Sequence, residues 1–429
     1  MSLHRAIAAR AERFLAIAAV AGLILIAFVF APGMEMFRTA KEAAMRVQAI
    51  LSLFALAVAI AYGGTARIRE LLRDRAVVVI LAGALLCTIL TTLTSQRRLL
   101  SIDSLVTVIC SVILFIAVWY VADHLPITAL LILVPAAAVN AILAALQELG
   151  IWNPFTFMYS LKSNPHLATS ALLGNPNDVG GYLALCAIIL FATTGFLQGR
   201  LRWVCATGAL IALMGVVVSQ SRTGVLTIAA AGIFLAFRRS RKTALIATLV
   251  LVALIFVAMQ VDLPGLTRVA HIPSQLAQGQ WDALFSDRLP AFATAVAMFR
   301  AHPLLGVGPG TYKFFYMPYR IHLNDVYPKE IMRGAGVNFA EAHNDHLQLL
   351  AETGIAGYAL FVAACVVIAL RARRNAESDD ERVRFAAHLA IPFVITIAVL
   401  ALAFFPLQIA STRHLLITTA ALILGWSRA

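Results

Sequence analysis

Two histidines and two glutamates lie within twelve residues, in the segment Glu341–Glu352. A histidine kept neutral by its neighbours is a suitable general base near pH 7, and this is the role we predict here. A zinc site is the alternative, with His343 and His346 as ligands and Glu341, Asp345 or Glu352 as the third. It is disfavoured because the spacing matches no zinc signature and no cysteine lies nearby. Capping of a helix at the membrane interface would account for Asn344 and Asp345 but not for the histidines.

Two arginines are further candidates. Arg222 lies in Ser219-Gln220-Ser221-Arg222-Thr223-Gly224, between two apolar segments. An arginine at the membrane edge either anchors a helix end by snorkelling or faces a polar cavity, and the polar residues around it favour the cavity. Arg288 begins a predicted amphipathic helix over 287–302, with Asp287 at the N-cap and Pro290 in the first turn. Position alone makes Arg288 an exposed loop residue paired with Asp287 or Asp282.

Three other groups have an ordinary structural interpretation beside a functional one. Asn177, with Asn175 and Asp178, either caps a helix or contacts a substrate. Tyr312 and the aromatic residues after it form an interfacial belt or stack on sugars. The glycines of 306–310 resemble a phosphate loop, but no strand precedes them and no Lys-Ser/Thr follows, so a nucleotide site is not expected.

The elements that must position these residues are membrane-spanning helices. Of the 429 residues, 61% are hydrophobic and 13% are charged, and the apolar residues form long uncharged segments without the alternation of a β-barrel. All five cysteines lie inside such segments, where a thiol acts as a small hydrophobe. We predict twelve spans, near residues 14–31, 44–62, 76–94, 104–121, 126–147, 177–197, 201–219, 223–238, 242–261, 346–370, 383–404 and 408–426.

The distribution of basic residues predicts the orientation. Nineteen of the 34 lysines and arginines fall in one set of connecting segments, and eight, including Arg97 and Arg98, fall in the short segments on the other side. The positive-inside rule then puts both termini in the cytoplasm, and the net charge of +13 needs no nucleic acid to explain it. The first apolar segment is interpreted as an uncleaved signal anchor. The chain divides into spans over 1–261, a large outer loop with amphipathic helices over 262–345, and spans over 346–429.

Three motifs in this order resemble the O-antigen ligase/polymerase superfamily. They are Ser219-x-Ser221-Arg222-x-Gly224, then Arg288 with Phe299-Arg300-Ala301-His302-Pro303-Leu304-Leu305-Gly306-Val307-Gly308, then His343-Asn344-Asp345-His346-Leu347 with Glu352-Thr353-Gly354. The resemblance covers about residues 170–370. It implies an all-α polytopic membrane protein, about 12 transmembrane helices with one large periplasmic loop containing short helices, like a GT-C glycosyltransferase of the bacterial inner membrane.

The resemblance also implies a reaction and its residues. The expected activity is transfer of O-antigen polysaccharide from undecaprenyl pyrophosphate to a sugar hydroxyl of lipid A–core. The reaction would invert the anomeric configuration and need neither a metal nor another cofactor, and membrane lipids would surround the protein. His343 would be the base, Arg222 and Arg288 would stabilise the leaving pyrophosphate, and Glu341 or Asp345 would orient His343. The predicted substrate-binding residues are Glu341, Asn344, Asp345, His346, Tyr312, Asn177, Arg97 and Arg98.

Other activities remain open. An O-antigen polymerase and a protein O-oligosaccharyltransferase belong to the same superfamily, and ligase is favoured on resemblance and length. A lipid or glycan transporter is a different class of protein, and it would show inverted repeats and ionisable residues at mid-membrane. The spans here are nearly free of charge and no repeat is visible. The identities of the sugars and the oligomeric state do not follow from the sequence.

Overall fold

The described part of the protein is a bundle of long apolar helices with a group of short helices at one end. The computed structural model describes residues 3–32, 35–156, 169–246, 248–249, 271–323 and 338–428. Its helices are α1 (Leu3–Phe28), α2 (Arg38–Gly63), α3 (Ala66–Arg73), α4 (Arg75–Thr94), α5 (Arg98–Val121), η1 (Ala122–His124), η2 (Ile127–Ile132), α6 (Leu133–Glu148), α8 (Pro176–Thr194), α9 (Gly199–Val218), α10 (Arg222–Arg239), α13 (Ile272–Ala277), α14 (Trp281–Leu284), α15 (Leu289–Ala301), α16 (Tyr312–Leu323), α17 (Asp345–Arg374), α18 (Glu381–Ala403) and α19 (Ala410–Trp426).

The prediction of an all-α polytopic membrane protein is confirmed. Nine helices in the described residues are long and apolar enough to cross a membrane: α1, α2, α4, α5 with η1, η2 with α6, α8, α9, α17 and α18. Each coincides with one of the predicted spans. Helices α10 and α19 also form where spans were predicted, and the predicted span over 242–261 lies mostly outside the described residues.

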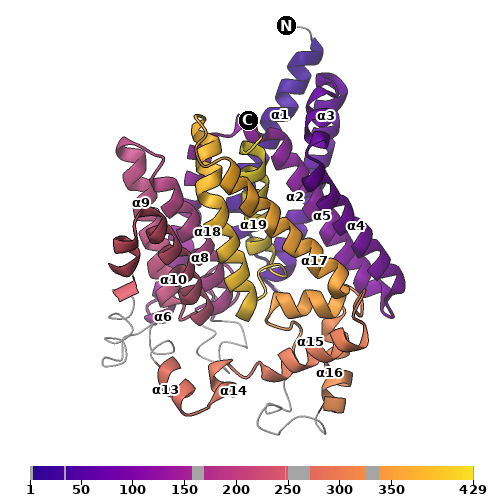
Figure 1. Ribbon diagram of the computed structural model, residues 1–429, viewed down its shortest axis with the longest axis vertical. Coiled ribbons are helices and arrows are strands. Elements are labelled where there is room, and N and C mark those ends of the chain that lie inside the picture. The colour runs from indigo at the N-terminus through magenta and orange to yellow at the C-terminus, as the bar shows by residue number, and fades with distance from the viewer. Residues whose placement is uncertain are drawn as a thin grey trace.

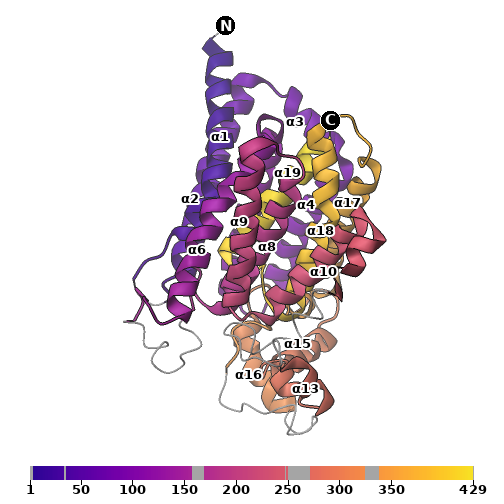
Figure 2. The ribbon, with the colours of Figure 1, turned by 90° about the vertical axis from the view of Figure 1, so that its left-hand side faces the viewer.

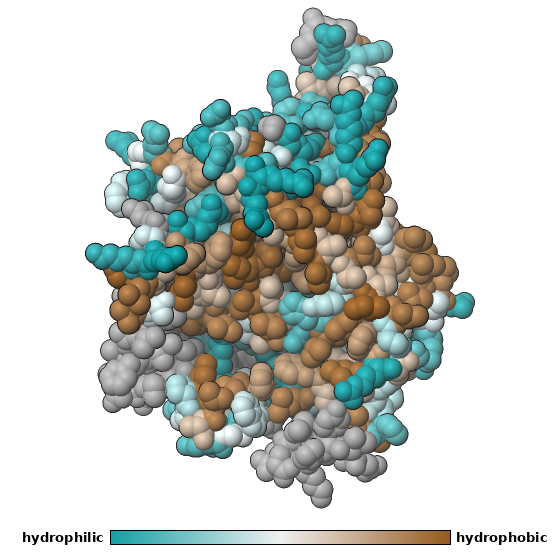
Figure 3. All heavy atoms as spheres, in the orientation of Figure 1, coloured by the Kyte–Doolittle hydropathy of each residue, from teal (hydrophilic) through white to brown (hydrophobic). Residues whose placement is uncertain are grey.

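Both chain ends lie at one end of the bundle, and α13 to α16 lie at the other, which is called the loop end below (Figures 1 and 2). On the face shown in Figure 3, apolar residues cover the middle of the bundle, and hydrophilic residues gather at the end that carries the termini. The first helix packs into the bundle rather than standing apart: Leu15, Ala19 and Leu23 are buried, and the Tyr182 hydroxyl donates to the carbonyl oxygen of Leu23 at 3.4 Å.

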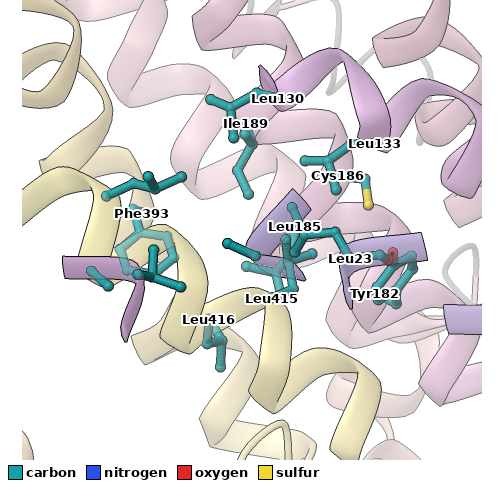
Figure 4. Close-up of a cluster of buried hydrophobic side chains, with 14 of the residues drawn as sticks. Leu23, Leu130, Leu133, Tyr182, Leu185, Cys186, Ile189, Phe393, Leu415 and Leu416 are labelled. Carbon is teal, nitrogen blue, oxygen red and sulfur yellow. Dashed lines mark hydrogen bonds between the residues drawn. The ribbon is translucent and has the colours of Figure 1, made fainter. Parts of the chain in front are cut away.

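Helix α8 is the centre of the bundle. Within its apolar window 83% of the residues are buried inside the protein. The helix packs against α9, α10, α18, α6, α19 and η2, and Figure 4 shows part of this core, with Leu23 of α1 beside Tyr182. Its N-terminus is fixed locally, because the Asn175 side chain accepts hydrogen bonds from the backbone N–H groups of Asn177 (2.9 Å) and Asp178 (3.0 Å). Pro176 occupies the first helical turn, where its missing N–H costs nothing.

Helix α17 is broken at Gly354, whose backbone is non-helical (φ 63°, ψ −165°). The break leaves backbone groups without helical partners, and the loop after α15 provides them. The amides of Val307 and Gly308 donate to the carbonyl oxygens of Ala351 (2.9 Å) and Glu352 (3.0 Å), and the amide of Ile355 donates to Pro303 O (2.8 Å). Backbone groups at membrane depth must be satisfied within the protein, and this loop does so.

The glycines of this loop are required for close approach. A Cβ atom at Gly306 (φ 66°) would lie 2.3 Å from the backbone carbon of Glu352, and one at Gly308 would lie 2.3 Å from the Ser95 hydroxyl at the α4–α5 turn. The loop is therefore held between α17 and the α4–α5 turn, and its glycines have a packing role. This docking fixes the positions of α15 and α16.

The small helices have a core of their own below the bundle. It comprises Ala291, Ala295 and Met298 of α15, Tyr312 and Tyr316 of α16, and Val307, Ala342 and Ala351. One predicted detail was wrong: Arg288, not Asp287, occupies the N-cap of α15, and the helix begins at Leu289. Asp287 instead has a positive φ of 59° in the turn before it. Pro290 lies in the first turn, as predicted.

Candidate active site

The polar residues of the candidate active site converge on the C-terminal end of α18. Its last carbonyl groups have no partners within the helix and carry partial negative charge. The Arg288 guanidinium donates to Ala403 O at 2.6 Å, the Thr223 hydroxyl donates to the same oxygen at 3.4 Å, and the Asn344 amide donates to Leu402 O at 2.9 Å. The end of one helix thus joins α10, the N-terminus of α15 and the N-terminus of α17.

His343 lies directly before α17 in a left-handed backbone conformation (φ 53°), which is uncommon for a residue with a side chain. Its ring packs edge-on against Phe405 and Phe339, with centroid distances of 4.7 and 5.5 Å. Nδ1 is buried and has no hydrogen-bond partner within the described residues. The two rings and the tight turn, rather than a carboxylate, hold the imidazole in place.

Burial lowers the pKa of His343 well below its usual value, and the positive charges of Arg288 and Arg38 lower it further. The imidazole is therefore neutral at pH 7, which is the protonation state of a general base. The charged groups that act on the ring are thus both cations. The structure brings His343 and Arg288 together, as expected from the order of the motifs.

Arg222 is the first residue of α10. The Ser221 hydroxyl caps this helix by accepting from the backbone N–H of Gly224 (3.2 Å). The Arg222 guanidinium donates to the carbonyl oxygens of Ala283 (3.0 Å) and Leu284 (2.9 Å) at the end of α14. It is linked to the His343 region through its neighbour Thr223, which shares the Ala403 carbonyl with Arg288.

The small residues around Arg222 have a packing function. A Cβ atom at Gly180 of α8 would lie 2.2 Å from the Cβ of Ser221 and 2.7 Å from the Ser219 hydroxyl. One at Gly224 would lie 3.0 Å from the carbonyl oxygen of Gly180. The Ser-x-Ser-Arg-x-Gly segment thus lies directly on the central helix, and this close contact sets the position of Arg222.

Several residues of the histidine motif are engaged in structural contacts. Asn344 caps α17, since its side-chain oxygen accepts from Leu347 N at 2.9 Å. Asp345 is fully buried and accepts from Leu407 N in the α18–α19 connection at 2.7 Å. His346 Nε2 lies 3.0 Å from Ala398 O and Nδ1 lies 3.2 Å from the Tyr358 hydroxyl. A carbonyl only accepts, so Nε2 donates and Nδ1 accepts, which leaves neither nitrogen for a ligand.

The remaining predicted contacts are more dispersed. Tyr312 is fully buried and its hydroxyl donates to Ala291 O at 2.9 Å, so it supports α15 and does not face a substrate. Asn177 lies in the first turn of α8, half-buried. Arg97 and Arg98 are exposed at the α4–α5 turn, where the Arg97 guanidinium lies 3.8 Å from the centroid of the Phe314 ring. These two arginines belong to the loop end but not to the surroundings of His343.

Glu341 forms an ion pair with Arg38 at the start of α2, with Nη1 2.6 Å from Oε1. The contacts of Glu341 and Asp345 described here are therefore to Arg38 and to the α18–α19 connection, and neither carboxylate is seen to orient His343. The sequence left open whether Arg38, one of the outer basic residues, binds acceptor phosphates or lipid head groups, and it did not single out Phe405 or the Ala403 carbonyl. The available signal for Arg38 was its position, because it is a basic residue just before an apolar segment, on the same side of the predicted membrane as the motifs.

The described residues hold no group of three histidine, cysteine, aspartate or glutamate side chains placed to bind a metal ion. His343 has aromatic and cationic neighbours, and cations so close to a histidine oppose a metal at that ring. The arrangement instead offers a neutral imidazole beside guanidinium groups. That combination can accept a proton and stabilise an anion.

Residues 207–362 match the family model described as O-Antigen ligase. The matched segment contains Arg222, Arg288, the glycine loop, His343 and the break at Gly354. A comparison with the curated proteins gives no match.

Proposed function

We propose that this chain, of which residues 207–362 match the O-antigen ligase family, is a member of that family and transfers O-antigen polysaccharide from undecaprenyl pyrophosphate to a sugar hydroxyl of lipid A–core. The chain would act in the bacterial inner membrane, with the loop end in the periplasm and both termini in the cytoplasm. The observation that carries the proposal is the neutral, buried imidazole of His343 held next to Arg288. A base and an anion-binding group side by side are what glycosyl transfer from a lipid pyrophosphate requires.

In the proposed reaction, the acceptor hydroxyl oxygen attacks the anomeric carbon of the donor sugar. A carbon–oxygen bond to the acceptor forms as the bond to the pyrophosphate oxygen breaks, and the bonding electrons leave with the lipid pyrophosphate. The proton of the attacking hydroxyl passes to His343. A single direct displacement inverts the configuration at the anomeric carbon.

The leaving pyrophosphate gains negative charge, and Arg288 and Arg222 are proposed to stabilise it. Guanidinium groups suit phosphate oxygens because they donate two parallel hydrogen bonds. In the structure both arginines donate to backbone carbonyls at helix C-termini. These carbonyls hold the side chains in place before the phosphate oxygens arrive, so less ordering is needed at the moment of reaction.

The proposal is tested with purified protein in nanodiscs, given a lipid-linked O-antigen and lipid A–core. We expect the joined glycolipid, its loss in His343→Ala, and its retention in His302→Ala, which removes an exposed histidine at the end of α15. Full activity of folded His343→Ala would exclude the general-base role. Growth of the lipid-linked glycan without joining would assign the protein to the polymerase reaction, and glycosylation of an added acceptor protein would assign it to the third activity of the superfamily.

A further inference from the structure

Arg38 lies beside the candidate active site although it is far from the family motifs in sequence. It is the first residue of α2, and its guanidinium carbon lies 5.4 Å from the centroid of the Phe405 ring. The other neighbour of that ring is His343, with 4.7 Å between centroids. Arg38 also acts electrostatically on His343, together with Arg288. One aromatic ring therefore separates the proposed base from a third arginine.

The bonding of Arg38 differs from that of the two motif arginines. Arg222 and Arg288 donate to backbone carbonyl groups, which cannot move without the helices that carry them. The guanidinium of Arg38 donates through Nη1 to the Glu341 side chain, and this is the one hydrogen bond that its side chain makes to a described residue. A guanidinium has five N–H groups, so Arg38 keeps donors for a second partner. Its side chain is 38% exposed, which leaves those donors accessible.

Glu341 offers this guanidinium the same chemistry that a phosphate would. A carboxylate and a phosphate both present two anionic oxygens to the planar fork of arginine. The carboxylate is on a flexible side chain at the loop end and is 17% exposed, so it can leave Arg38 without unfolding a helix. Ion pairs that are partly exposed are weakly held, so an incoming anion with more charge can replace the carboxylate.

The rest of this charged cluster is fixed. The Lys41 ammonium is buried and donates to three carbonyl oxygens at the end of α1, those of Ile26, Ala27 and Val29, at 2.8 to 3.0 Å. Asp178, which also acts electrostatically on Arg38, is 2% exposed in the first turn of α8. Glu35, an exposed residue in the turn before α2, also acts electrostatically on Arg38 but forms no ion pair with it among the described residues. The ion pair of Arg38 that can be exchanged is thus the one with Glu341.

We propose that Arg38 binds the pyrophosphate of the lipid-linked donor, and that Glu341 occupies its place on the guanidinium when no donor is bound. This inference rests on the proposed function for the identity of the donor. It adds to the site a residue from the N-terminal helices, outside the segment that matches the family model. It also gives Glu341 a defined role: a competitor of the donor, not a ligand of the sugar.

The experiment measures binding of undecaprenyl pyrophosphate without a glycan to the purified full-length protein in nanodiscs of a neutral phospholipid. Binding does not depend on turnover. We expect Arg38→Ala to weaken binding at least tenfold and Arg38→Lys, which keeps the charge but not the fork, to weaken it less. Glu341→Gln removes the competing charge and is expected to strengthen binding severalfold. Arg46→Ala is the matched control, because it removes a cation from the same helix in an ion pair with Asp103, and it should bind as the unmodified protein does.

Two results would overturn the inference. One is unchanged binding in Arg38→Ala. The other is equal weakening in Arg38→Ala and Glu341→Gln, which would mean that the ion pair only holds the loop in place. Thermal unfolding of each variant identifies any loss of folded protein, and Arg38→Lys carries the test if Arg38→Ala does not fold.

The failure of this inference is distinguishable from failure of the proposed function. If the expected ranking of the variants is observed but no glycan is transferred, Arg38 binds a lipid pyrophosphate and the proposed reaction is wrong. If glycan is transferred and the donor KM of Arg38→Ala equals that of the unmodified protein, the reaction stands and the role of Arg38 is wrong.

Discussion

Helices α8 and α17 are both apolar and both carry polar residues at their N-terminal ends, yet they differ in burial and in continuity. In the apolar window of α8, 83% of residues are buried inside the protein, against 11% in that of α17. The apolar residues of α8 therefore pack against other helices, whereas most of those of α17 are partly or fully exposed. Helix α8 is continuous and capped by Asn175, whereas α17 is broken at Gly354 and repaired by a loop. Helix α8 thus supports the site from inside the bundle, whereas α17 carries the residues of the histidine motif at its N-terminal end.

The largest effect is expected from His343→Ala, directly before α17. Loss of a general base lowers the rate by about 10²- to 10⁴-fold. Stability should change little, because the ring packs at the loop end and not against α8. Turnover and thermal unfolding of the same preparation check both statements. If His343→Ala loses folded protein to the same extent as activity, the side chain is needed for folding, and the expected separation of catalysis from stability is contradicted.

The break in α17 should be sensitive to Gly306→Ala. The new Cβ would lie 2.3 Å from backbone of Glu352, at a residue with φ 66°. Backbone atoms cannot rotate away as a side chain can, so we expect about 3 kcal/mol of destabilisation, the upper end for overpacking. Limited proteolysis between α15 and α16 would report the released loop, and activity should fall with it. Unchanged protease resistance would show that the loop does not depend on this contact.

A smaller effect is expected at the centre, from Gly180→Ala in α8. Its Cβ would meet Ser221 at 2.2 Å, and α10 must shift to accommodate it. Overpacking of this kind costs about 1 to 3 kcal/mol. Thermal unfolding measures that cost, and the movement of Arg222 should raise the donor KM as well. Gly232→Ala, with nothing within 4 Å of the added methyl group, is the control on α10. Helix propensity favours alanine over glycine, so it cannot cause a loss of stability. An equal loss in both variants would mean that contact with Ser221 is not what makes Gly180→Ala destabilising.

The pH dependence tests the surroundings of His343. Burial and, after it, the positive charges of Arg288 and Arg38 lower the pKa of His343, so the imidazole loses its proton at a lower pH than an ordinary histidine. The acid limb of kcat/KM should therefore lie below about pH 6.5, the usual histidine pKa. Arg38→Ala removes one positive charge, so the pKa of His343 rises and the limb moves to higher pH. If the acid limb does not move in Arg38→Ala, the charge of Arg38 does not affect the pKa of His343.

The smallest effect is expected from Tyr358→Phe on α17. It removes the hydroxyl that donates to Nδ1 of His346, and a single hydrogen bond contributes about 1 kcal/mol. Activity should remain within a fewfold of the unmodified protein, because His346 holds α17 against α18 through Ala398 and does not face the site. A loss of activity as large as that of His343→Ala would assign His346 to the reaction.

The membrane part of the fold followed from the sequence because lipid imposes one rule, long apolar segments, on every spanning helix. Motifs also identified His343 and Arg288 as neighbours. They did not reveal that the site is assembled on the carbonyl of Ala403, because every residue has such a group and only the end of a helix exposes it. Tyr312 was predicted to lie at the membrane interface or against a sugar, but helical periodicity does not tell which apolar face covers a small core. Arg38 was missed because its partner, Glu341, is brought near only by the fold.

The reliance of the site on the end of α18 has a consequence for biosynthesis. During translation, α2, α8 and α10 are made first, then the small helices and His343, and only afterwards the carbonyl of Ala403 and the ring of Phe405. A nascent chain that ends after α17 would contain every family motif and still lack the groups that draw Arg288 and His343 together. If the proposed function holds, activity would thus begin only after α18 has entered the membrane, and a chain released before that point would be inactive.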